Sequence, residues 1–300
     1  KAHLSGKIEV PFCPESRLSG IGNTDFINAV WYRRDIDIPR EALDGNVLIT
    51  FGAVDYEAII YINGSAVCEH TGGYTPITVN ATTFLHEGIN SLCVYAKDNI
   101  RKGIPHGKQS ELLHSHNCDY TRTTGIWQTV YMEFLPKSYI KNAALTPDAE
   151  NQSVSAVIET NGAGELIFET FFEGKPMGKA TKKTSGGTVL LETKLAESHL
   201  WEVGCGRLYD VKITFEGDVY ETYFGLRSVR LSGKKFLINN KSVFQKLVLD
   251  QGYYEDGIYT APTAKALEED IKLSMSLGFN GARPHMKVFE PLYFYYADKY

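Results

Sequence analysis

Apolar and polar positions alternate with a period of two along most of the first 135 residues. The run 31–38 alternates and ends before Pro39, and the run 56–62 leads into Asn63-Gly64. This dipeptide is typical of a type I′ hairpin turn, because both of its central residues need a positive φ. No stretch between these runs has the helical period. The pattern predicts one β-sandwich of jelly-roll type over residues 1–137.

The next segment, 138–226, repeats this style at a shorter scale. Apolar runs separated by Gly-rich turns such as Gly186-Gly187 indicate about seven strands. The runs that can be located are 153–159, 165–173, 188–195, 209–215 and 220–224. This spacing favours an immunoglobulin-like sandwich, although the Cys, Trp, Cys spacing of antibody domains is absent.

The pattern changes in residues 227–300. The run 244–249 is mostly apolar without clean alternation, as in a parallel strand covered on both faces. Thr263 can cap a helix that carries Leu267, Ile271 and Met275 on one stripe and that closes at Gly278. A second strand over 279–283 and a helix opening at Pro291 follow.

This order of strand, helix, strand and helix predicts the first βα units of a (β/α)8 barrel. Such a barrel takes about 250 residues, so we expect the chain to be part of a longer protein. The fold class expected is therefore mainly β, with a jelly roll, an immunoglobulin-like sandwich and an incomplete TIM barrel in that order.

Composition and charge narrow the function. The 31 basic and 36 acidic residues give a net charge of -5, and no stretch concentrates basic residues, so nucleic acid is not an expected partner. No apolar run approaches the roughly 20 residues of a membrane span. We expect a soluble chain, either cytoplasmic or exported with its signal removed. Five cysteines without a Cys-x-x-Cys pair predict small buried residues rather than a disulfide framework.

Several short motifs occur in an order that resembles glycoside hydrolase family 2, and in particular its β-galactosidase-type members. They are Trp31-Tyr32-Arg33-Arg34, the run 51–56, Asn63-Gly64, the run 70–76, Gly107-Lys108-Gln109, the run 124–128, the run 224–227 and Leu277-Gly278-Phe279-Asn280. The resemblance covers nearly the whole chain. It implies a retaining exo-glycosidase in which the barrel carries the chemistry.

Such an enzyme needs two carboxylates about 5 to 5.5 Å apart. In the family these are glutamates on later barrel strands, so we expect them beyond Tyr300 and assign no catalytic residue in this chain. The acidic residues of 255–256 and 268–270 are a weaker alternative, because three of them are adjacent on one predicted helix.

Four residues are predicted to bind the substrate. Arg283 and His285 close the second barrel strand and Asp250 ends the first, and active sites of this fold lie at those strand ends. The resemblance assigns Arg283 and His285 to the sugar pocket, although Arg-Pro-His-Met-Lys is one residue shorter between Arg and His than the Arg-x-Ser-His-Tyr-Pro of many members. Asp119 corresponds to a jelly-roll carboxylate that reaches the sugar site in some β-galactosidases and helps to bind sodium. Each of the four has a structural alternative, as a rim, turn or loop residue.

Cofactors are not expected. The resemblance alone suggests sodium or magnesium, and nothing else in the sequence supports either ion. His114, His116 and Cys118 could suggest zinc, but no fourth ligand with regular spacing follows them. Trp31, Trp127 and Trp201 could form a sugar-stacking platform, although core packing is the better prediction for Trp31 and Trp127, which lie inside strand patterns.

The first hypothesis is that the parent protein hydrolyses a terminal β-linked sugar by double displacement, with galactose as the leading candidate, and that this chain alone is inactive. The alternative is a non-catalytic carbohydrate-binding module of a larger protein. A carbohydrate is the expected partner in both. Homo-oligomers could also form, because Leu267, Ile271 and the run 293–296 would expose apolar surface in an incomplete barrel.

Overall fold

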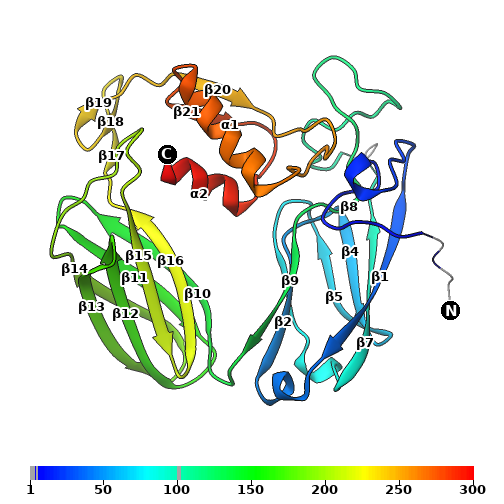
Figure 1. The fold of residues 1–300 in the computed structure, drawn as a ribbon, viewed down its shortest axis with the longest axis horizontal. Helices are drawn as coiled ribbons and strands as arrows, with labels where there is room; N and C mark the ends of the chain where they lie inside the picture. Colours follow the sequence, from blue (N-terminus) through cyan, green and yellow to red (C-terminus); the bar gives the residue numbers. More distant parts are fainter. Residues whose placement is uncertain (1–3, 5, 100–102) are drawn as a thin grey trace. The chain divides into compact units, whose positions relative to one another are not determined.

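The chain is mainly β and forms two compact units (Figure 1). The computed structural model describes residues 4, 6–99 and 103–300. The first unit comprises Lys1–Phe134, Leu249–Asp270 and Ala282–Tyr293, and the second comprises Leu135–Val248, Ile271–Gly281 and Phe294–Tyr300. The predicted boundaries at 137 and 226 stay a prediction.

The first unit contains a β-sandwich. One antiparallel sheet has the strand order β1-β7-β4-β5, a second has β6-β2-β9, and β3 pairs with β8. The elements are η1 (Arg17–Ser19), β1 (Ala29–Ile38), η2 (Arg40–Asp44), β2 (Asn46–Phe51), β3 (Val54–Asp55), β4 (Glu57–Ile62), β5 (Ser65–Thr71), β6 (Ile77–Asn80), η3 (Thr82–Phe84), β7 (Gly88–Lys97), β8 (Gly125–Ile126) and β9 (Val130–Leu135). Inward-facing side chains of both main sheets, such as Ile60 of β4 and Phe51 of β2, share one core.

The predicted hairpin at Asn63-Gly64 joins β4 to β5. Asn63 has φ 51° and Gly64 has φ 87°, as a type I′ turn requires. The Asn63 side chain also accepts a hydrogen bond from the Ser91 amide at 2.9 Å and donates one to Asn90 at 2.8 Å. The turn therefore fixes both the hairpin register and its contact with the neighbouring strand β7.

The second unit contains another antiparallel sandwich. Its sheets have the orders β10-β11-β14 and β13-β12-β15-β16, and their inner faces share one core that includes Phe168 and Tyr209. The strands are β10 (Ile140–Asp148), β11 (Ser153–Thr160), β12 (Gly164–Phe172), β13 (Lys175–Thr184), β14 (Gly187–Lys194), β15 (Leu208–Phe215) and β16 (Asp218–Gly225). A small sheet of β17 (Val229–Ser232), β18 (Lys235–Ile238) and β19 (Lys241–Ser242) follows. The seven strands agree with the number expected from the sequence.

The last elements alternate between strand and helix. They are β20 (Leu247–Asp250), α1 (Ala264–Ser276), β21 (Gly281–Pro284) and α2 (Pro291–Lys299). The Asn280 amide donates to the Lys246 carbonyl at 3.0 Å and the His285 amide to the Asp250 carbonyl at 2.8 Å, so the two strands run parallel. None of the helices in the described part of the chain is long and apolar enough to cross a membrane.

The helix signals in this segment are confirmed. Thr263 Oγ1 accepts a hydrogen bond from the Ala266 amide at 3.1 Å, and Gly278, with φ 87°, closes α1 by donating to the Met275 carbonyl. The prediction that the first strand is covered on both faces is wrong for this chain. Leu247 and Leu249 of β20 are 39% and 51% exposed, because the sheet contains only β20 and β21.

The hairpin turn gives a test of the fold. Gly64→Ala should reduce the free energy of unfolding by about 1 kcal/mol, because a Cβ meets open space there but the left-handed φ disfavours it. Chemical denaturation followed by tryptophan fluorescence measures the change. Gly103→Ala is the matched control, because its Cβ also meets open space without a positive φ. Equal effects of the two substitutions would contradict the turn assignment.

Candidate active site

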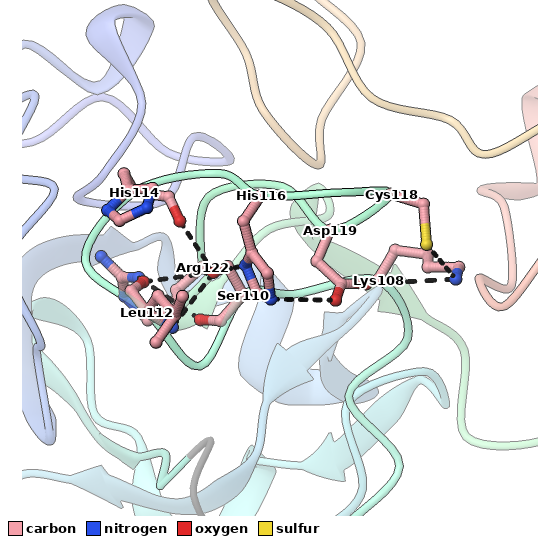
Figure 2. Close-up of polar contacts among 8 residues, drawn as sticks. All are labelled: Lys108, Ser110, Leu112, His114, His116, Cys118, Asp119 and Arg122. Atoms are coloured by element: carbon pink, nitrogen blue, oxygen red, sulfur yellow. Dashed lines mark hydrogen bonds and ion pairs between the residues drawn. The ribbon is translucent and has the colours of Figure 1, made fainter.

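A long loop between β7 and β8 supplies one side of the candidate site. Buried polar side chains hold the part of this loop around residues 110–116. Ser110 Oγ bonds the His114 carbonyl oxygen and His116 Nδ1, both at 2.9 Å. The buried Arg122 guanidinium donates to the Leu112 carbonyl, and its central carbon lies 4.3 Å from the Phe26 ring centroid. Figure 2 shows these contacts converging on Ser110 and Arg122.

Charged side chains of this loop, Lys108 and Asp119, lie close to each other. Lys108 Nζ donates to Cys118 Sγ at 3.1 Å and lies 4.0 Å from Asp119 Oδ1, and these side chains face one another in Figure 2. The hydrogen bond to Cys118 and the nearby Asp119 charge raise the pKa of Lys108. Asp119 Oδ2 also lies 3.8 Å from His116 Nε2. Asp119 therefore lies within 4 Å of one nitrogen of Lys108 and one of His116.

The three donors that could suggest zinc do not come together. The His114 ring and the Cys118 thiol lie on opposite sides of the group of residues drawn in Figure 2, and His116 forms a hydrogen bond with Ser110. Among the residues that the structure describes, no group of three or more His, Cys, Asp or Glu side chains could hold a metal ion.

The parallel strands β20 and β21 supply the second side of the site. Asp250, at the end of β20, accepts hydrogen bonds from the Gly252 amide at 2.8 Å and the Tyr293 hydroxyl at 3.1 Å. The His285 amide donates a hydrogen bond to the Asp250 carbonyl, so the two residues are neighbours at the ends of the two strands. Arg283 lies on β21 with its side chain exposed.

His285 lies in an electropositive environment. Partial burial lowers the pKa of His285, and the positive charges of Arg283 and Lys108 lower it further. Its Nδ1 atom is buried and has no hydrogen-bond partner within the described structure. These effects favour the neutral imidazole, which can both donate and accept a hydrogen bond.

A buried lysine lies behind the strand ends. Lys287 Nζ donates to the carbonyl oxygens of Gly252 and Tyr259, at 2.5 and 2.6 Å. It lies 4.8 Å from the ring centroids of Tyr259 and Phe289 and 5.4 Å from that of Trp127. Burial lowers the pKa of Lys287 to about 7, and the nearby Glu290 and Asp250 charges partly oppose this. We call Lys287 with these three rings the lysine cage.

Aromatic contacts join the two sides of the site within the first unit. Tyr120 stacks on Tyr253 with centroids 4.0 Å apart, and the Tyr74 and Tyr259 hydroxyls are 2.6 Å apart. Gly107 must be glycine here, because it has φ 64° and a Cβ would collide with the Met286 carbonyl oxygen. The loop and the strand ends therefore pack closely.

The four predicted site residues are thus linked through this one region. Asp250 contacts His285, the charges of Arg283 and Lys108 act on His285, and Lys108 lies beside Asp119. Their roles in binding stay predictions. The sequence reasoning missed Lys287 and Lys108 as contributors. Lys108 lies within the motif Gly107-Lys108-Gln109. Nothing in the sequence marks Lys287 as buried, because a lone lysine after a strand is ordinarily exposed.

Two sequence predictions need correction. Trp127 is buried in the core as predicted, but Trp31 is 49% exposed, because its strand position faces outward from the sheet. The cysteines are not mostly buried. Only Cys13 is buried, Cys68 and Cys93 are partly buried, Cys118 and Cys205 are exposed, and all five thiols are free.

Comparison with known proteins finds a family model that matches part of the chain. Residues 21–136 match the family model described as "Glycosyl hydrolases family 2, sugar binding domain". This segment is similar to that family's sugar binding domain. The resemblance inferred from the sequence motifs is therefore confirmed, and the matched residues include the β1–β9 sandwich and its long loop.

Relatives extend the similarity beyond the family 2 domain. A β-glucuronidase of Streptococcus agalactiae is 27% identical over 288 residues, which cover 86% of this chain and 45% of that protein. A β-galactosidase of Thermoanaerobacter pseudethanolicus is 26% identical over 235 residues, covering 72% of this chain and 31% of that protein. The crystal structure of Ruminococcus gnavus β-glucuronidase matches 91% of this chain and 48% of its own, with a TM-score of 0.77 and 20% identity. The chain therefore shares the fold of the matched part of that protein, and it spans less than half the length of these relatives.

The lysine cage predicts a dependence of stability on pH. The pKa of Lys287 is about 7 when folded and about 10.4 when unfolded, so the unfolded state binds more protons between these values. The free energy of unfolding should therefore rise by up to about 1.4 kcal/mol per pH unit between pH 7 and 10, relative to Lys287→Met. Urea titrations of both proteins at several pH values measure this. Parallel pH profiles would contradict the burial of an ionisable amine.

The electrostatics at His285 predict a second titration. The pKa of His285 should lie below the ordinary value of about 6.5, and Lys108→Met should raise it by removing one of the neighbouring charges. NMR of the histidine ring nitrogens measures both. Lys97→Met is the control, because that amine pairs with Glu57 instead. An unchanged His285 pKa in Lys108→Met would show that Lys108 does not act on this ring.

Proposed function

We propose that this chain is the N-terminal part of a retaining exo-β-glycosidase that acts on β-glucuronides. The family 2 domain and the relatives named above support a glycosidase parent. The parallel pair β20 and β21, with α1 between them, supports the prediction that a (β/α)8 barrel begins here. In this proposal the β1–β9 sandwich is the predicted jelly roll.

The observation that carries the choice of substrate is the positive charge at the strand ends. The charges of Arg283 and Lys108 both act on His285, and Arg283 is exposed to an incoming ligand. A glucuronide carries a carboxylate that a galactoside lacks, and guanidinium groups form charge-assisted hydrogen bonds with carboxylates. A neutral His285 imidazole can bond a sugar hydroxyl beside them.

Asp119 and Asp250 suit the sugar hydroxyls, because carboxylates accept hydrogen bonds from hydroxyl donors. Each is already positioned by other groups, Asp119 by Lys108 and His116 and Asp250 by Gly252 and Tyr293. In this proposal neither is the acid/base or the nucleophile. Those two carboxylates come from later barrel strands, so the 300-residue chain binds one side of the sugar and is inactive alone.

A β-galactoside is the second candidate substrate. The sequence motifs favoured it, and one relative is a β-galactosidase. The two candidate substrates differ in charge, because only the glucuronide carries a carboxylate. Binding of a neutral galactoside should depend little on the charge of Arg283.

The test uses the product of the longer reading frame. It should hydrolyse 4-nitrophenyl β-D-glucuronide with a higher kcat/KM than 4-nitrophenyl β-D-galactoside. Arg283→Gln should lower kcat/KM for the glucuronide by about tenfold or more, because a charge-assisted hydrogen bond contributes about 1.5 to 3 kcal/mol. Its effect on any galactoside activity should be smaller. Arg40→Gln, which removes a surface ion pair with Asp44, is the control.

Preference for the galactoside with no effect of Arg283→Gln would favour the second candidate. A frame that ends near Tyr300, or a product that hydrolyses neither substrate, would refute the glycosidase proposal.

A further inference from the structure

Three aromatic side chains lie together on the outer face of the four-stranded sheet of the first sandwich. Trp31 on β1 is directly opposite Tyr95 on β7, and their ring centroids are 4.8 Å apart with planes 40° apart. The Trp31 ring also reaches Tyr61 on β4, at 5.6 Å and 33°. These strands are consecutive in the order β1-β7-β4 (Figure 1). We call these three residues the aromatic platform.

The platform faces away from the core of its sandwich. The residues that alternate with its members, Tyr32, Val94, Ile60 and Ile62, are buried in the core, so Trp31, Tyr95 and Tyr61 face outward. Trp31 is 49% exposed, and the two tyrosines are partly exposed.

Strand pairing explains only part of this cluster. Aromatic pairs directly across two strands stabilise a sheet, and Trp31 with Tyr95 is such a pair. Tyr61 is not in their row, because it pairs in register with Cys93 of β7. Trp31 therefore leans across β7 to reach it, and the three rings together cover three strands.

Ion pairs border the platform on two sides. Lys97 Nζ lies 3.4 Å from Glu57 Oε2 one row away, and Arg33 Nη2 lies 3.1 Å from Asp35 Oδ1 on the other side. All four side chains are about half exposed. The rim therefore offers both hydrogen-bond donors and hydrogen-bond acceptors. Its two positive charges are balanced by two negative charges.

We propose that the aromatic platform is a sugar-binding surface, separate from the candidate active site, for the neutral pyranose rings of a polysaccharide. The apolar C–H face of a pyranose packs on an aromatic ring, while its hydroxyl groups bond polar groups at the ring edge. The whole platform lies within residues 21–136, which match the sugar-binding family model. The proposal does not depend on the activity of the parent protein.

The surroundings favour this occupant over others. A stable protein partner buries about 800 Å² on each side, whereas this platform is three rings bordered by charged pairs. An anionic ligand would have to compete with Glu57 and Asp35 for Lys97 and Arg33. A neutral sugar can accept and donate hydrogen bonds at this rim without separating either ion pair.

Affinity electrophoresis of the full 300-residue chain tests the proposal. Native gels would contain barley β-glucan, xyloglucan, galactomannan or β-1,4-galactan, with polygalacturonate as an anionic comparison. At least one neutral polysaccharide should retard the chain. Trp31→Ala should weaken this binding by about tenfold or more, because the sugar loses the apolar area of the indole, and Tyr95→Ala should also weaken it.

Tyr131→Ala is the matched control, because this 48% exposed tyrosine lies on β9 of the other sheet. Trp31→Phe separates binding from folding, since it keeps a ring opposite Tyr95 and should retain part of the affinity. Retardation in none of the neutral gels, or equal retardation of wild type and Trp31→Ala, would overturn the proposal. So would concentration-dependent dimers that Trp31→Ala abolishes without any sugar binding.

Discussion

The buried amino group of Lys287 connects separate segments of the first unit. Lys287 is 9% exposed, and its ammonium group is held by two backbone carbonyls and three aromatic rings. Burying an amino group is costly unless its N–H groups find hydrogen-bond acceptors, so the two carbonyls must keep their positions. Trp127 belongs to the sandwich, whereas Gly252, Tyr259 and Phe289 belong to the segments around β20 and β21. The lysine cage thereby fixes those segments to the sandwich.

The candidate active site depends on this attachment. Asp250 and His285 lie at the strand ends, while Lys108 and Asp119 lie on the loop between β7 and β8. These groups come from parts of the chain more than a hundred residues apart, and only tight packing brings the Lys108 charge close enough to act on His285. The Tyr120 and Tyr253 stack and the close approach at Gly107 reinforce the same arrangement. The aromatic platform is different, because it needs only the register of β1, β7 and β4.

Local signals in the sequence predicted most of the strands. Alternation located β1, β4, β12 and β15, and Asn63-Gly64 located a hairpin, because each depends on neighbouring residues alone. Two strands of the second sandwich, β13 and β10, were not located. β13 lies at a sheet edge and is rich in lysine, and β10 is also an edge strand and contains Pro147, which only an edge position tolerates.

The site was predictable where topology alone places a residue, and not where tertiary packing does. Asp250, Arg283 and His285 follow from the rule that barrel sites lie at strand ends, and Asp119 came from family resemblance. Nothing local distinguishes Lys287 from a solvated lysine, because its cage is built from three separate segments. Trp31 was wrongly assigned to the core, because alternation separates the two faces of a strand but does not show which face is covered.

The most direct test of this account is an NMR measurement on the chain with ¹³C-labelled lysine. The rings of Trp127, Tyr259 and Phe289 should shift one lysine ε-methylene signal strongly upfield and show NOEs to it, and that signal should disappear in Lys287→Met. If every lysine ε-methylene signal lies at its ordinary position, the amine is solvated. The cage then does not hold these segments to the sandwich, and the arrangement of the candidate site described here is wrong.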